Sequence, residues 1–172
     1  MSSTGRTLDH YVDININELV ADTFPFADTV HVRDHCLCLH AQRAARALAR
    51  LFDDALRPVG LTNSQFSLLN ALNRPAPATM SEVSRLLGAD RTTLTAALKV
   101  LEREGLTRTV ADPADQRARR IALTPAGHAR LITALPIWTA MHAGLEAELD
   151  AGQPEQLRQG LNALSAPPQR VF

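Results

Sequence analysis

Apolar residues recur every three or four positions along most of the chain, a spacing typical of amphipathic helices. The first long stretch of this kind covers residues 33–56 and predicts one continuous helix, which Pro58 and Gly60 end. Its apolar stripe consists of Leu37, Ala41, Ala44, Leu48, Leu51, Phe52 and Ala55. Upstream, residues 13–20 predict a short helix, and residues 24–26 separate the two.

The later helices have clearer start signals. Thr62 predicts a capped helix that runs to residue 72. Thr124 followed by Pro125 should begin a long helix that reaches about residue 149 and bends at Pro136. A final short helix is predicted over residues 155–164.

Between residues 79 and 127 the pattern changes to two short helices and a hairpin. Thr79 and Glu82 have the spacing of a capping box, so a helix should run over residues 80–87 until Gly88 ends it. Asp90 is a good N-cap for a second helix over residues 91–104. Two helices joined by such a tight turn are typical of a helix-turn-helix.

The second of these helices has two different faces. One face should be buried and consists of Leu94, Ala97, Leu98 and Leu101. The other is small, hydroxylated and basic, and consists of Arg91, Thr92, Thr95, Ala96, Lys99 and Arg103. Short side chains allow close approach to a DNA major groove, hydroxyls bond phosphates or bases, and cations meet the backbone. The sequence therefore predicts a DNA-binding regulator.

The segment after this helix reads as a β-hairpin. Residues 106–110 and 119–123 are β-prone, and Asp and Pro residues between them favour a turn. A hairpin directly after a recognition helix is a wing, and Arg117 near its tip is predicted to enter the minor groove. We expect Asp115 to hold an arginine in place, with Arg117 or Arg91 as its partner.

Five short motifs occur here in a specific order and spacing. They are Leu87-Gly88, Asp90-Arg91-Thr92-Thr93-Leu94-Thr95, Leu101-Glu102-Arg103-Glu104-Gly105-Leu106, Asp112-Pro113-Ala114-Asp115-Gln116-Arg117 and Leu123-Thr124-Pro125-Ala126-Gly127. Together they resemble the MarR (multiple antibiotic resistance regulator) family of winged-helix repressors, over roughly residues 34–150. One departure is Gln116, where many members of the family have a second arginine.

The resemblance implies a mainly α fold with a small β-hairpin wing, a winged helix-turn-helix with long N- and C-terminal dimerisation helices. Residues 1–32 would form an N-terminal arm, residues 33–60 and 124–172 the helical dimerisation region, and residues 61–123 the DNA-binding domain. A homodimer would place two recognition helices about one DNA turn apart, ~34 Å, on a palindromic operator in double-stranded DNA. The predicted DNA contacts are Ser81, Arg91, Thr92, Thr93, Thr95, Lys99, Arg103, Asp115, Arg117 and Arg119.

Charge and composition agree with this prediction without strengthening it much. The formal net charge is zero, but residues 80–130 hold nine Lys and Arg against six Asp and Glu. No apolar run approaches the ~20 residues that cross a bilayer, and no signal peptide is evident, so we expect a cytoplasmic protein without a membrane partner. No nucleophile–base pair, phosphate loop or paired carboxylates point to an enzyme or to a cofactor.

The signal that controls DNA binding is harder to read. The family resemblance favours release of a repressor by a small aromatic or phenolic effector, bound between the dimer helices and the DNA-binding lobe. Candidate lining residues are His40, Arg43, Phe66, Trp138 and His142. The ligand would shift the population toward a spacing of recognition helices that no longer fits adjacent major grooves.

Two cysteines suggest an alternative, a thiol-based peroxide sensor. Leu37-Cys38-Leu39 resembles the reactive segment of the peroxide-sensing branch of the family, although Phe52 and Asn63 replace tyrosines that assist the thiol there. Cys36 and Cys38 on one helix would point to different sides, which disfavours a disulfide. We therefore favour packing of Cys38 as a small apolar group, with redox sensing as the alternative.

A metal-responsive regulator is a third, weaker hypothesis. His31, His35, Cys36, Cys38 and His40 lie within ten residues of one another. Their spacing does not bring four ligands together from one helix, so we predict no metal site.

Overall fold

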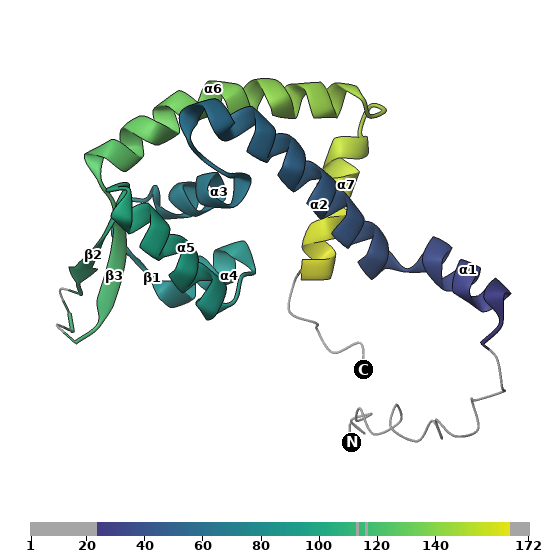
Figure 1. Cartoon of the computed structure of the whole chain (residues 1–172), viewed down its shortest axis with the longest axis horizontal. Coiled ribbons are helices and arrows are strands. Elements are labelled where there is room, and N and C mark those ends of the chain that lie inside the picture. The colour runs from purple at the N-terminus through teal and green to yellow at the C-terminus, as the bar shows by residue number, and fades with distance from the viewer. Residues whose placement is uncertain (1–23, 113, 116, 166–172) are drawn as a thin grey trace, which may run out of the picture. The chain divides into compact units, whose positions relative to one another are not determined.

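The computed structural model describes residues 24–112, 114–115 and 117–165 (Figure 1). The helix predicted over residues 13–20 and the departure at Gln116 lie outside the described residues. The chain divides into two compact units, one that ends at Ala44 and resumes at Arg158, and one formed by Ala45–Leu157. The functional division into arm, dimerisation region and DNA-binding domain stays a prediction.

The first unit begins with two helices where the sequence predicted one. α1 covers Phe26–His35 and α2 covers Leu37–Leu56. The helix predicted over residues 33–56 is wrong at its start, because Cys36 leaves the helical conformation with φ −74° and ψ 102°. Its N–H still donates to the Val32 carbonyl at 2.9 Å, so the first helix closes before the chain turns.

The apolar side chains of this unit form no hydrophobic core among its described residues. None of its described residues is buried, and Phe26 and Leu37 remain 79% and 69% exposed. Of the predicted stripe on α2 only Phe52 is buried, while Leu48 stays exposed; Leu56, which was not predicted as part of the stripe, is also buried. Over most of its length the stripe is therefore not covered by any of the residues that the structure describes.

The second unit holds the hydrophobic core. A short 3-10 turn, η2 (Arg57–Val59), leads from α2 to α3 (Asn63–Leu72), which begins at the predicted cap Thr62; Gln65 completes a capping box there. α3 packs against α4 (Met80–Leu87), α6 (Pro125–Ala147) and the sheet. The largest fully buried side chains are Leu56, Leu68, Leu69, Val83, Leu101 and Leu106.

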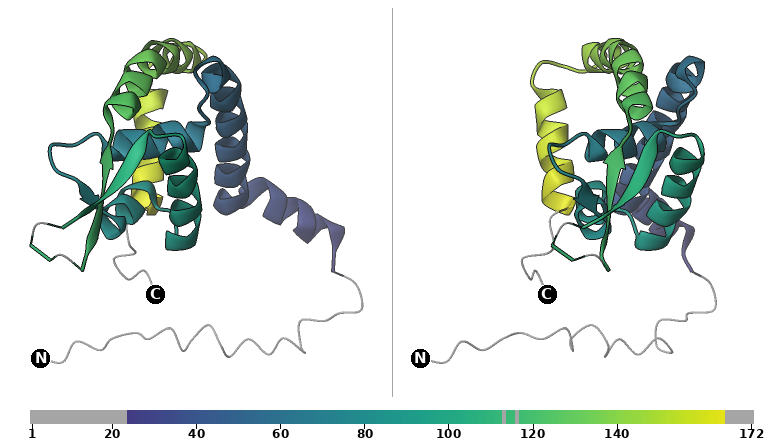
Figure 2. Two further views of the ribbon diagram at one scale, coloured as in Figure 1. Left: turned by 60° about the vertical axis from the view of Figure 1, so that its left-hand side comes forward. Right: turned by 90° about the vertical axis from the view of Figure 1, so that its left-hand side faces the viewer.

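A three-stranded antiparallel sheet completes this unit. β2 (Thr107–Ala111) and β3 (Arg119–Leu123) form the predicted hairpin, and β1 (Ala78–Thr79) pairs with the other edge of β3. Ile121 lies opposite both Ala78 and Thr109, so β3 is the central strand. The sequence did not predict β1, because two residues are too few for an alternating pattern. The hairpin projects from the helices of this unit (Figure 2).

α6 begins with the predicted cap, and the capping residue also bonds the segment between α5 and β2. The Thr124 hydroxyl accepts the Gly127 N–H at 3.1 Å and donates to the Gly105 carbonyl at 2.6 Å. The Thr124 N–H donates to the Leu106 carbonyl at 3.1 Å. α6 is curved in Figure 1 and contains Pro136, in agreement with the predicted bend.

The last helix, α7, covers Gln153–Ser165 and agrees with the prediction for residues 155–164. None of its residues is buried, and Leu157, Leu161 and Leu164 are exposed. Within the part of the chain that the structure describes, no helix is long and apolar enough to span a bilayer.

Gly127 provides a test of the junction between α6 and β2. A Cβ at this position would lie 2.2 Å from the Leu106 carbonyl oxygen, so Gly127→Ala should destabilise the protein by about 2–3 kcal/mol. Gly144→Ala is the matched control in the same helix, since a Cβ there meets nothing within 4 Å. We expect that control to stabilise by about 0.5–1 kcal/mol through helix propensity. Urea unfolding at one fixed protein concentration measures both, and equal effects would contradict the close contact.

Candidate nucleic-acid interface

α4 is fixed at its start by reciprocal hydrogen bonds. The Thr79 hydroxyl accepts the Glu82 N–H at 3.2 Å, and the Glu82 carboxylate accepts the Thr79 N–H at 2.7 Å. This N–H, together with the Thr79 hydroxyl, holds the pKa of Glu82 below its usual value. Gly88 ends the helix at φ 61°, and the Ser84 hydroxyl donates to the Ala89 carbonyl across the turn. The predicted capping box is confirmed.

α5, the predicted recognition helix, covers Arg91–Arg103 behind the cap at Asp90. The Thr93 hydroxyl and N–H donate to the Asp90 carboxylate at 2.6 and 2.8 Å, and these bonds lower the pKa of Asp90. Leu94, Leu98 and Leu101 are buried as predicted, whereas Ala97 is half-buried. The residues of the opposite face are all exposed, as predicted: Arg91, Thr92, Thr95, Ala96, Lys99 and Arg103.

A side-chain contact joins α5 to the wing. Glu102, in the last turn of α5, accepts the Thr109 N–H from β2 at 3.0 Å. Since successive strand residues point to opposite faces, Thr107 and Thr109 share the face that meets α5, and Arg108 points away from it. The hairpin is therefore held beside the outward face of α5.

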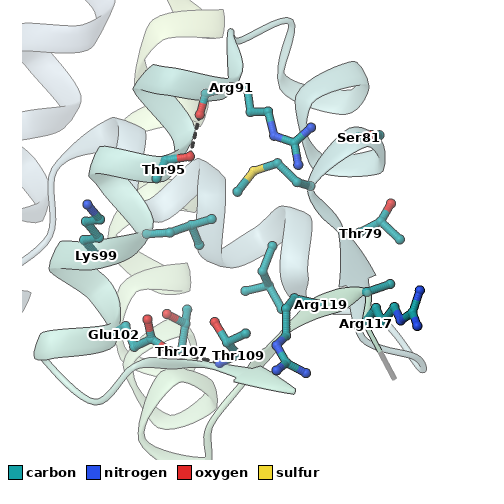
Figure 3. Close-up of a pocket in the computed structure, with 14 residues that line it drawn as sticks. Thr79, Ser81, Arg91, Thr95, Lys99, Glu102, Thr107, Thr109, Arg117 and Arg119 are labelled. Carbon is teal, nitrogen blue, oxygen red and sulfur yellow. Dashed lines mark hydrogen bonds between the residues drawn. The ribbon is translucent and has the colours of Figure 1, made fainter. Parts of the chain in front are cut away.

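An open groove of about 560 Å³ lies between α4, α5 and the wing (Figure 3). Figure 3 shows Arg91 and Thr95 on one side of this groove and Thr107, Thr109 and Arg119 on another. Six of the ten predicted DNA contacts line it: Ser81, Arg91, Thr95, Lys99, Arg117 and Arg119. The groove combines cations with hydroxyls, which are the donors that bind phosphate oxygens and base edges.

Four predicted contacts lie outside this groove. Thr92 and Arg103 are exposed on α5, while the hydroxyl of Thr93 is engaged by the Asp90 carboxylate. Thr79, Met80, Thr107 and Thr109 also line the groove and were not among the predicted contacts. The alternation within residues 107–111 was a signal for the two wing threonines.

The predicted role of Asp115 as a partner for an arginine side chain is wrong. Its carboxylate accepts the backbone N–H of Arg117 at 2.9 Å, so it shapes the turn of the wing. The arginine pair occurs instead between Asp112 and Arg120, at 2.6 Å. An aspartate can bond a backbone N–H two residues ahead at almost no cost in chain entropy, which favours this local bond.

The candidate effector residues fall into two groups. Phe66 on α3 stacks with Trp138 on α6, with their ring centroids 6.4 Å apart. The ring centroids of Trp138 and His142 are 4.7 Å apart. A cavity of about 420 Å³ is lined by Phe66, Ser67, Asn70, Ala71, Leu86, Leu87, Leu135 and Trp138. His40 and Arg43 belong to the other compact unit and do not line this cavity.

The cysteine and histidine segment lies at the break between α1 and α2. Cys38 is exposed, contrary to the favoured expectation that it packs as an apolar group within the chain, and Cys36 is half-buried. The Gln42 amide donates to the Cys38 sulfur at 3.2 Å. The rings of His35 and His40 bond the carbonyls of His31 and Cys36. Across the described residues, no group of three or more His, Cys, Asp and Glu side chains converges on a common point.

The helix-turn-helix, its wing and the cationic groove define the class of winged helix-turn-helix proteins. A model of the MarR family matches residues 59–118. The transcriptional regulator MosR of M. tuberculosis, solved in complex with DNA, is 40% identical with a TM-score of 0.69, and the alignment covers 76% of this chain and 94% of MosR. A probable transcriptional regulator from Pseudomonas aeruginosa is 29% identical with a TM-score of 0.69, over 76% of this chain and 98% of that one.

A curated relative matches over a shorter region. The transcriptional activatory protein BadR of Rhodopseudomonas palustris is 32% identical over 88 residues, which are 49% of this chain and 50% of BadR. The match therefore spans about half the length of that relative. On the family model and the likeness to MosR over nearly its whole length, the chain belongs to the MarR family.

The cap of α5 provides a test by pH. Because the folded pKa of Asp90 is below its unfolded value of about 3.9, its contribution to stability is complete above about pH 5 and is lost as the pH falls further. Asp90→Asn keeps a capping side chain but binds no proton in this range. Between about pH 6 and about pH 3, wild type should lose more unfolding free energy than the variant. Equal losses in urea unfolding would show that the cap charge contributes nothing.

Proposed function

We propose that the protein is a homodimeric, sequence-specific DNA-binding transcriptional regulator. The observation that carries this proposal is the groove in which Arg91, Lys99 and Arg117 gather around exposed threonines. In the proposed complex the outward face of α5 enters a major groove, and Arg117 on the wing reaches the adjacent minor groove. The excess of positive charge in residues 80–130 is small. DNA docking therefore depends on shape complementarity and on paired subunits more than on a strong electrostatic field.

The helices outside the DNA-binding unit support a dimer. Apolar side chains on α1, α2 and α7 are exposed, and the unit that ends at Ala44 and resumes at Arg158 has no buried residue among those described. Helices that are apolar on one face need a covering surface, and a second copy of the chain supplies it in our proposal. Two recognition helices would then meet the two halves of a palindromic operator.

The proposed regulation is repression. A dimer bound across a promoter hinders access of the polymerase, and release restores transcription. BadR is an activatory protein, so the measurement should allow for either an increase or a decrease of transcription when the protein is bound to the promoter. The described architecture gives no reason to assign an enzymatic activity, and we propose none.

The favoured input is a small aromatic or phenolic effector in the cavity between α3, α4 and α6. Phe66 and Trp138 offer ring faces, and Asn70 and Ser67 offer polar groups. None of its described lining residues is cationic, which favours a neutral phenol over an aromatic acid. The ligand would act by favouring a conformation that binds DNA less well.

A thiol-based input is the second candidate, and the break at Cys36 favours it. The objection that both cysteines point to different sides of one helix no longer holds, because Cys36 is not helical. Cys38 is exposed and so accessible to a hydroperoxide. Attack of its thiolate would cleave the peroxide O–O bond, form a sulfenic acid and release water or an alcohol.

Arg117→Ala tests the DNA interface. Loss of one minor-groove or phosphate contact should weaken operator binding by about tenfold and reduce the slope of log K against log salt by about one. Arg108→Ala removes the same charge from the hairpin but from the face turned away from α5, and should change affinity by less than about threefold. Fragments selected from genomic DNA supply the operator for a salt series of gel shifts. Equal losses in both variants would refute specific docking of the wing, and absence of any selected fragment would refute the regulator.

A DNA-release assay distinguishes the phenolic effector from the thiol-based signal. A neutral phenol should quench the emission of Trp138, the one tryptophan of the chain, and release DNA from wild type and from Cys38→Ser. Asn70→Leu should raise the required phenol concentration about tenfold, since a polar contact with the phenol hydroxyl is lost. Hydroperoxide should leave DNA binding unchanged. Release by hydroperoxide that Cys38→Ser abolishes, with no effect of phenols, would replace the effector proposal by the thiol sensor.

A further inference from the structure

A buried carboxylate lies at the base of the wing. Asp112 follows β2 directly, and its side chain is only 9% exposed. One carboxylate oxygen accepts the Ala114 N–H at 2.9 Å, and the other accepts Nε of Arg120 at 2.6 Å. The Asp112 N–H donates to the Ala118 carbonyl at 3.1 Å. The residue therefore closes the turn that carries Arg117 and cannot itself meet DNA.

Arg120 connects Asp112 to the segment before β1. Its second nitrogen, Nη1, donates to the carbonyl of Pro77 at 3.2 Å, 43 residues earlier in the chain. Pro77 directly precedes β1, and β1 leads into the capping box that starts α4. One guanidinium thus joins the turn of the wing to the segment from which the helix-turn-helix begins. We call Asp112, Arg120 and the Pro77 carbonyl the wing clasp.

The clasp lies on the opposite side of β3 from the groove. Arg119 and Ile121 line the groove, so the intervening Arg120 points to the other face of the strand. Glu82 lies near this side, where it interacts electrostatically with Arg120 and pairs with Arg74 at 3.7 Å. Only an arginine has the fixed fork that reaches an aspartate and a carbonyl together.

We propose that Asp112 and Arg120 are positioning residues for DNA docking, which fix the wing and its Arg117 relative to α4 and α5. This inference rests on the proposed DNA-binding function. Without the clasp, the hairpin keeps its two-residue pairing with β1 and the bond between Glu102 and Thr109, but its turn loses the link to the Pro77 segment, and Arg117 samples more positions relative to the recognition helix. Ordering it again on DNA costs conformational entropy, and affinity falls.

Asp112→Asn distinguishes a positioning role from a purely electrostatic effect, because the two predict opposite changes in the affinity for the operator. Removing a negative charge from a DNA-binding unit should by itself strengthen binding to phosphates. Loss of the clasp should instead weaken operator binding by about tenfold. Glu104→Gln is the matched control: it removes an exposed acid at the end of α5 and should leave affinity equal or higher.

Arg120→Lys provides the converse variant, since it keeps the charge and loses the fork. We expect a loss of about tenfold, while Arg108→Lys on the same hairpin should change affinity by less than about twofold. Combining Asp112→Asn with Arg117→Ala tests the coupling directly. Arg117→Ala should cost about tenfold in wild type and less than about threefold in the Asp112→Asn background.

Amide hydrogen exchange of the DNA-free variants separates this inference from the proposed function. Residues 107–123 should exchange faster in Asp112→Asn and Arg120→Lys, while the core helices α3 and α6 keep their protection. Unchanged exchange in the hairpin, tighter DNA binding by Asp112→Asn, or equal cost of Arg117→Ala in both backgrounds would overturn the inference. If faster exchange occurs but no form of the protein binds DNA, the clasp stands and the proposed function fails.

Discussion

The central strand β3 connects the parts of the DNA-binding unit. It pairs with the linker strand β1 on one edge and with the wing strand β2 on the other, and it runs directly into the cap of α6. Ile121 places its side chain in the core while Arg119 and Arg120 point to opposite faces. Because one strand fixes linker, wing and α6, a change at any of these contacts alters where the groove-lining cations lie.

The groove itself combines rigid and adjustable parts. The inner leucines of α5 are buried in a packed core, so its outward cations and hydroxyls are presented on a fixed helix. The wing has no core of its own and is held by its strand pairing, by Glu102 and by the wing clasp. In the proposed complex, the helix would therefore read the DNA and the wing would adjust the affinity.

The input of such a regulator must reach this unit through its helices. The Thr124 hydroxyl and the close approach of Gly127 to Leu106 join α6 to the turn between α5 and β2. The aromatic cavity lies on the same α6, at Leu135 and Trp138. A ligand that shifts α6 would therefore act on a junction with little room to absorb the movement, whereas a signal at Cys36 and Cys38 would begin in the other compact unit.

The sequence by itself determined the elements whose signals are local. The caps at Thr62, Thr79, Asp90 and Thr124 occur where they were predicted, because a capping bond spans only three residues and needs no tertiary context. The tertiary structure decided what depends on distant partners: strand β1 and the pairing of Arg120 with Asp112 and Pro77. It also showed that Asp115 bonds its own turn. Contacts over eight to 43 residues form only after the core has set the distance, so no local pattern encodes them.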